Sequence, residues 1–97
     1  MALTLDDVKH YLNVTYDDED IDTKLTGILS RADVYIRNVV AAGANDTLTE
    51  VENQLVLDAC RYIFNDAFED FAHNFLTEIN GARSLRLIAA LPLESEG

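Results

Sequence analysis

The residues best suited to binding a metal ion form an acidic run near the N-terminus, "DDEDID" at positions 17–22. Alternate members of this run have the spacing of the first three calcium ligands of an EF-hand loop: Asp18, Asp20 and Asp22. That loop has glycine at its sixth position and glutamate at its twelfth, but Thr23 and Leu29 stand there in this chain. An acid-rich helix start, stabilised by the helix dipole, explains the run without a metal ion.

A second group with metal-binding chemistry is Glu69, Asp70 and His73, which have helical spacing. Helical dimetal sites need two such motifs, and the other histidine, His10, belongs to a different predicted helix. The sequence therefore predicts neither a metal site nor a cofactor.

Nucleophilic catalysis is also not indicated. The single Cys60 has no partner for an internal disulfide or a CxxC site, and it lies in an apolar helical sector, which is typical of a buried residue. The chain has no G-x-S-x-G turn and no glycine-rich loop before a helix. We therefore expect a protein that is not an enzyme.

Charge and length limit the function further. Eighteen acidic and seven basic residues leave a net charge of −11, which opposes binding to nucleic acid through phosphate contacts. A chain of 97 residues is expected to form one domain. No apolar run approaches the roughly 20 residues of a membrane span, and the N-terminus does not resemble a signal peptide. We expect a cytosolic protein without a membrane partner.

Glycine and proline are scarce, which favours an all-α domain. Capping residues and apolar spacing predict a small bundle of about four helices with one long central helix and a short C-terminal helix. The expected helices are 5–12 after Thr4, a second one that is capped by Asp18 or Asp20 and runs to about 40 with Gly43 as C-terminal cap, 50–76 with the capping box of Thr49 and Glu52, and 83–90. We expect a loop near 78–82 and a flexible tail at 92–97.

Four phenylalanines have the spacing of one side of the predicted central helix: Phe64, Phe68, Phe71 and Phe75. Apolar residues cover about 260° of this helix near its middle, whereas a surface helix of a small monomer buries about 100–150°. We expect other copies to cover part of this row, so that Phe71→Asp or Phe75→Asp abolishes assembly without unfolding. The alternative, a row that is wholly internal, stays open.

Two cations stand near the C-terminus of a chain otherwise rich in acids, Arg83 and Arg86. They either interact with solvent and the C-terminal end of their helix, or meet the acidic surface of a neighbouring copy. We count them as candidate subunit contacts together with the four phenylalanines.

Most of the chain resembles the head-tail connector proteins (head completion or adaptor proteins) of long-tailed bacteriophages and prophages. The first helix has the family's "T-L-x-x-V-K-x-Y-L" pattern, an acidic link follows, and the long second helix carries "A-x-x-Y-I". The matching positions are Thr4, Leu5, Val8, Lys9, Tyr11, Leu12, Asp17 to Asp22, Ala32, Tyr35, Ile36 and Gly43. Many members have a proline before the last helix, whereas Gly81 stands there in this chain and Pro92 follows the helix.

The resemblance implies an all-α subunit without catalytic residues that assembles head to tail into a ring of about twelve copies. Such a ring binds the portal protein and other head-completion or tail proteins, and genomic DNA passes through it without specific binding. The resemblance places the protein at the head-tail interface of the virion, and in the host cytoplasm before assembly. The alternative is a small acidic regulatory or inhibitor protein that docks on a basic partner.

Overall fold

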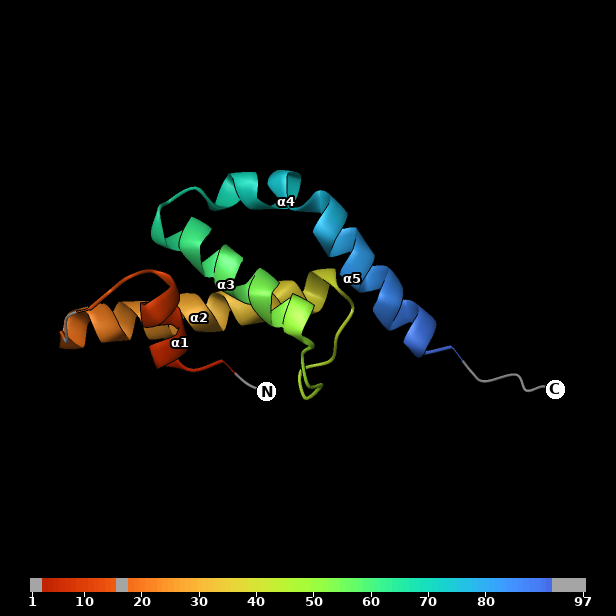
Figure 1. The fold of residues 1–97 in the computed structure, drawn as a ribbon, viewed down its shortest axis with the longest axis horizontal. Coiled ribbons are helices and arrows are strands. Elements are labelled where there is room, and N and C mark those ends of the chain that lie inside the picture. The colour runs from red at the N-terminus through yellow and green to blue at the C-terminus, as the bar shows by residue number, and fades with distance from the viewer. Residues whose placement is uncertain (1–2, 16–17, 92–97) are drawn as a thin grey trace.

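The computed structural model describes residues 3–15 and 18–91, and within these ranges every regular element is a helix (Figure 1). The all-α class is therefore confirmed. In chain order the elements are α1 (Leu5–Tyr11), α2 (Glu19–Val39), α3 (Glu50–Phe64), the 3-10 helix η1 (Phe68–Asp70), α4 (Phe71–Asn74) and α5 (Leu76–Ala89). The expected tail at 92–97 lies outside the described residues.

The starts of α1, α2 and α3 follow the predicted caps. Thr4 and Asp7 form a capping box on α1, and Thr49 and Glu52 form another on α3. The carboxylate of Asp18 accepts hydrogen bonds from the first backbone N–H groups of α2, which confirms it as the N-cap. The acidic run therefore stands at the start of a helix, as predicted, because the helix dipole favours negative charge there.

The predicted central helix over 50–76 is wrong, because α3 ends at Phe64. Asp66 adopts a left-handed backbone with φ of 59°, and the Ala67 N–H donates back to the Tyr62 carbonyl at 2.8 Å. This bond closes a Schellman motif, which turns the chain out of the helix. The chain then forms two short helical segments, η1 and α4, before α5 begins.

The predicted loop near 78–82 is also wrong, since α5 runs without interruption from Leu76 to Ala89. Gly81 lies inside this helix, where an added Cβ would meet no atom within 4 Å. A helix tolerates a single interior glycine at a cost of about 1 kcal/mol. The C-terminal helix is therefore longer than the short one expected over 83–90.

Three helices end in left-handed residues that are not glycine, namely Asn13, Ala41 and Asp66. At the end of α2, Ala41 has φ of 64° and the Ala42 N–H donates to the Arg37 carbonyl at 2.8 Å. The prediction of Gly43 as this cap is wrong by two residues. Asparagine and aspartate reach this conformation more readily than alanine does, so Ala41 carries the largest backbone cost of the three.

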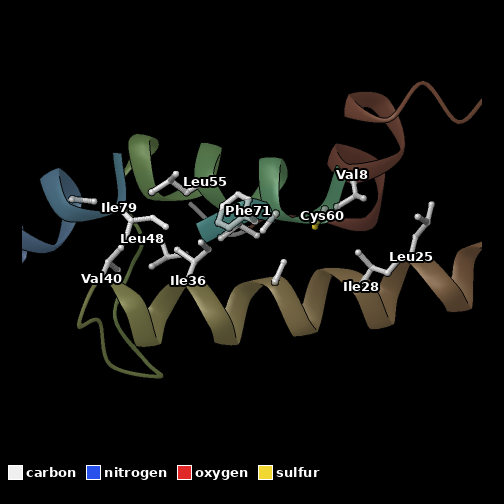
Figure 2. Close-up of a cluster of buried hydrophobic side chains, with 14 residues drawn as sticks. Val8, Leu25, Ile28, Ile36, Val40, Leu48, Leu55, Cys60, Phe71 and Ile79 are labelled. Atoms are coloured by element: carbon white, nitrogen blue, oxygen red, sulfur yellow. The ribbon is translucent and has the colours of Figure 1, made fainter. Parts of the chain in front are cut away.

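The core lies mainly between α2 and α3, which pack along each other, while α1 crosses the first half of α2 (Figures 1 and 2). Its buried apolar members are Val8, Leu25, Ile28, Ala32, Ile36, Val40, Leu48, Leu55, Val56, Ala59, Cys60, Phe71, Ile79 and Ala82. The molecule is elongated, with extents of 57 × 26 × 17 Å. The last part of α5 contributes nothing to this core.

The turn at Asp66 lets the chain fold back so that α4 delivers Phe71 into the core (Figure 2). Phe71 is 0% exposed, and its ring centroid lies 5.5 Å from that of Tyr62 on α3 and 6.1 Å from that of Tyr35 on α2. Both pairs meet edge to face, a favourable arrangement of aromatic rings. A straight helix over 50–76 would not bring this ring between α2 and α3.

Candidate functional site

The phenylalanine row does not project from the molecule as the sequence predicted. Phe71 is fully buried, and Phe64, Phe68 and Phe75 are half-buried against the core. Cations of α2 cover two of these rings, with Lys24 Nζ 5.3 Å from the Phe64 centroid and the Arg31 guanidinium 5.0 Å from that of Phe68. The chain itself thus covers much of the row. A partner contact through the exposed parts of the three outer rings stays a prediction.

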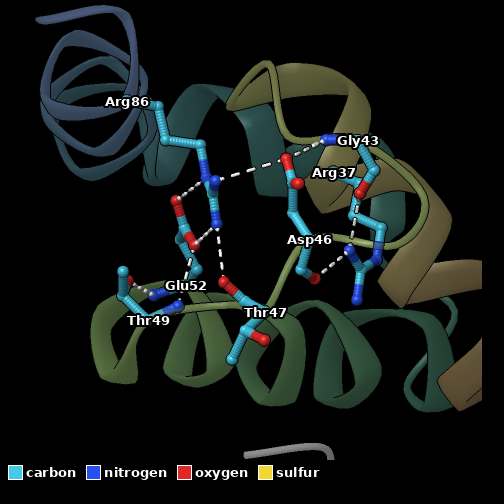
Figure 3. Close-up of polar contacts among 7 residues, drawn as sticks. All are labelled: Arg37, Gly43, Asp46, Thr47, Thr49, Glu52 and Arg86. Carbon is cyan, nitrogen blue, oxygen red and sulfur yellow. Dashed lines mark hydrogen bonds and ion pairs between the residues drawn. The ribbon is translucent and has the colours of Figure 1, made fainter. Parts of the chain in front are cut away.

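Arg86, which the sequence analysis named as a candidate subunit contact, forms hydrogen bonds within its own chain (Figure 3). Its Nε donates to Glu52 Oε2 at 2.6 Å, and its Nη2 donates to Glu52 Oε1 at 2.8 Å. Nη2 also donates to the Thr47 carbonyl at 2.9 Å, and Nη1 lies 3.5 Å from Asp46 Oδ2. These contacts make Arg86 the anchor of α5. Arg83 is exposed and keeps its predicted role as a candidate contact.

The electrostatics of the anchor favour the ionised pair. Glu52 is 1% exposed, and burial by itself would raise the pKa of its carboxyl group. Hydrogen bonds from Arg86 and Thr49 outweigh burial and lower this pKa below its usual value. The bond to Glu52 in turn raises the pKa of Arg86. Glu52 therefore has two roles, because it completes the capping box of α3 and holds α5.

A second arginine fixes the loop between α2 and α3. Arg37 Nη1 donates to the carbonyls of Gly43 and Asp46, each at 2.7 Å. The Asp46 carboxylate accepts from the Gly43 N–H at 2.7 Å and also faces Arg86. This loop is therefore held from α2 on one side and from α5 on the other (Figure 3).

Beyond its anchor, α5 leads away from the other helices and carries an apolar end (Figure 1). We call residues 85–91, "LRLIAAL", the α5 end. Its large apolar side chains are between 48% and 68% exposed: Leu85, Leu87, Ile88 and Leu91. Fully burying one such side chain contributes about 1.5–3 kcal/mol, and contiguous exposed apolar patches mark interaction sites.

The α5 end also differs in charge from the rest of the chain. No acidic residue stands between Glu78 and Glu94, whereas Arg83 and Arg86 both fall in this stretch. In a chain of net charge −11 the α5 end is therefore an apolar segment without acids, whose one cation, Arg86, is paired with Glu52. Sequence reasoning missed this site because it placed the unpartnered apolar surface on the phenylalanine row. The signal that could have found it is the near absence of polar residues from "LRLIAAL".

A surface cavity of about 530 Å³ lies beside α2. We call it the α2 cavity. It is bounded by one side of α2, by the loop before α3 and by Leu3, and leucines from all three parts line it: Leu3, Leu29 and Leu48. Ser30, Asp33 and Asp46 are among its polar lining residues.

The remaining reactive groups serve the fold. Cys60 is fully buried, and burial raises the pKa of its thiol to about 12, so the thiolate is scarce at neutral pH. The Tyr11 hydroxyl donates to Asp58 and joins α1 to α3. In the described part of the chain, no group of three or more His, Cys, Asp or Glu side chains is placed to hold a metal ion.

Over the same residues, no helix has the length and hydropathy needed to cross a membrane. Comparison of the chain with protein-family models, with curated proteins and with solved structures finds no match. The functional inference therefore depends on the α5 end, the α2 cavity and the resemblance noted above.

Proposed function

We propose that this protein is a structural virion component that assembles into a ring under the portal and joins the DNA-filled head to the tail. The observation that carries this proposal is the α5 end, an anchored helix whose outer residues expose an apolar surface. An exposed patch of this kind is typical of a subunit that buries it against a neighbour. The resemblance to head-tail connector proteins supplies the identity of the assembly.

The chemistry of the described residues supports assembly better than catalysis. The buried acid Glu52 is neutralised by Arg86, and the thiol of Cys60 lies inside the core. Neither group lines the α2 cavity. The most distinctive surface is instead the α5 end, which suits recognition of another protein.

The charge of the chain fits a channel that DNA traverses. A wall with net negative charge repels the phosphate backbone, so the duplex passes without binding. With −11 per subunit, a ring of about twelve copies would be strongly acidic. The α5 end, which has no acidic residue, would be withdrawn from the channel by burial at a contact between proteins.

The test is binding to the portal protein of the same phage or prophage. We expect the mixture to form a complex that sediments as one species and shows an added ring below the portal in electron micrographs. A portal protein whose sedimentation does not change, even with this protein in large excess, would refute the proposal.

The alternative, an acidic regulatory protein that docks on a basic partner, makes a different prediction. Its contact surface would be acidic, so raising the salt concentration would weaken binding strongly, and substitutions in the α5 end would have little effect. A contact through the apolar α5 end would instead lose its affinity on such substitutions and depend less on salt.

A further inference from the structure

We propose that the α5 end of one copy inserts into the α2 cavity of the next copy. This inference deepens the proposed function, on which it rests, by naming the two surfaces that join neighbouring subunits. It assigns a role to the exposed apolar side chains of the α5 end and to the α2 cavity, neither of which is covered by residues 3–15 and 18–91.

The shape of the α5 end favours an enclosing site. At about 100° per residue, its large apolar side chains spread over about 160° of the helix, and Ala89 and Ala90 lie on the remaining side. This arc slightly exceeds the roughly 100–150° that a surface helix of a small monomer buries. A cavity of 530 Å³ lies within the range of about 300–1,000 Å³ typical of sites that enclose most of what they bind. Its three leucines offer an apolar lining to the inserted side chains.

The charges are complementary as well. Asp33, Asp46 and Arg37 border the α2 cavity. Asp33 pairs with Arg37 and Asp46 faces Arg86, but the two acidic side chains remain 38% and 52% exposed. Arg83 stands one helical turn before Leu87 and makes no ion pair within residues 3–15 and 18–91. An inserted α5 end would bring this cation to the acidic border of the cavity. In an acidic chain that repels its own copies, these are the surfaces where a copy approaches most easily.

In this conformation α5 does not fill the cavity of its own chain. Arg86 holds α5 beside Asp46 and Thr47, at the border of the cavity, and residues 87–91 lead away and are all exposed (Figures 1 and 3). A symmetric pairing of two α5 ends would leave both cavities empty. Insertion into the next copy joins two different surfaces, so repetition produces a ring or a filament.

The test uses cysteine pairs on separate copies, in a Cys60→Ala background that removes the native thiol. One copy carries Ser30→Cys in the α2 cavity, and the other carries Ile88→Cys in the α5 end. Both sites are exposed, so the substitutions leave the fold intact. Thr77→Cys, an exposed position in the first turn of α5, replaces Ile88→Cys as the matched control. Mixtures are oxidised mildly with and without the portal protein.

We expect the Ser30→Cys and Ile88→Cys mixture to give at least tenfold more covalent dimer than either variant alone or the Thr77→Cys mixture. One chain that carries both substitutions should give a ladder of multimers. Dimers formed mainly by Ile88→Cys alone would overturn the inference in favour of symmetric pairing. Equal, low yields in every mixture, with and without portal protein, would also overturn it.

The outcome separates this inference from the proposed function. A specific cross-link in a protein that does not bind the portal would support the docking and refute the connector role. Portal binding without the cross-link would retain the connector role and refute the docking.

Discussion

Arg86 of α5 and Glu52 of α3 lie 34 residues apart in the sequence and form a two-point ion pair with N–O distances of 2.6 and 2.8 Å. The other inward residues of α5 are Ile79, which is buried, and the small Ala82. The direction in which α5 leaves the body therefore depends largely on Arg86, through this ion pair and its contacts with Thr47 and Asp46. Its loss would free the α5 end from its fixed position.

Removing the cation of this pair should destabilise the protein strongly. Arg86→Met leaves the Glu52 carboxylate buried with only Thr49 as partner, and we expect a loss of about 3 kcal/mol in the free energy of unfolding. Arg83→Met, on the exposed side of the same helix, should change it by less than about 0.5 kcal/mol. Urea unfolding measures both. Equal, small effects would show that the pair does not hold α5.

The same pair makes stability depend on pH. Because the folded-state pKa of Glu52 is lowered, its contribution is present above the ordinary glutamate pKa of about 4.3 and is lost as the pH falls through the folded value. We expect the melting temperature of the wild type to fall more steeply below about pH 4.5 than that of Glu52→Gln. The neutral variant serves as the control for the other carboxylates. If the melting temperatures of the wild type and of Glu52→Gln fell in parallel with pH, the lowered pKa of Glu52 would be contradicted.

The left-handed residue after α2 offers a stabilising substitution. Ala41→Gly removes the clash of a Cβ in that conformation, so we expect a gain of about 1 kcal/mol in the free energy of unfolding. Ala44→Gly, three residues later in the loop and without positive φ, should instead lose up to about 1 kcal/mol through greater freedom of the unfolded chain. Thermal unfolding compares the two. A loss of stability in Ala41→Gly would contradict the turn geometry.

The burial of Phe71 reverses the expectation from its spacing. Phe71→Ala should cost about 3–5 kcal/mol because it empties the space between Tyr35 and Tyr62. Phe64→Ala, at a half-buried ring, should cost less than half as much. Circular dichroism in denaturant measures both, and similar costs would place the two rings in similar surroundings. On this structure Phe71→Asp unfolds the protein, instead of abolishing assembly alone.

The starts of α1, α2 and α3 were predictable from the sequence, whereas the end of α3 and the start of α5 were not. Thr4, Asp18 and Thr49 have side chains that bind the free N–H groups of a helix start, so their types identify the starts. The turn after α3 depends on Asp66 in a left-handed conformation, which most aspartates do not adopt. Without a glycine or proline to mark it, the helical spacing continued through the turn and predicted one long helix.

Because the central helix was predicted too long, the candidate contact surface was placed on the phenylalanine row instead of on the α5 end. Local spacing correctly placed Phe64 on an apolar side, but it could not show that the chain reverses and returns Phe71 to the core. The partner of Arg86 was equally hidden, because Glu52 had already been explained by its capping box. When a residue makes both a local and a long-range contact, the sequence pattern indicates only the local one.

The central claim is that the α5 end is the surface through which this protein assembles. The most direct measurement is the mass in solution, with the portal protein present, of the double variant Leu85→Asp/Ile88→Asp. Val51→Asp serves as the matched control, because Val51 is 55% exposed on the first turn of α3. We predict that the wild type and the control join the portal complex, while the double variant stays a folded monomer. A double variant that assembles as well as the wild type would contradict the account.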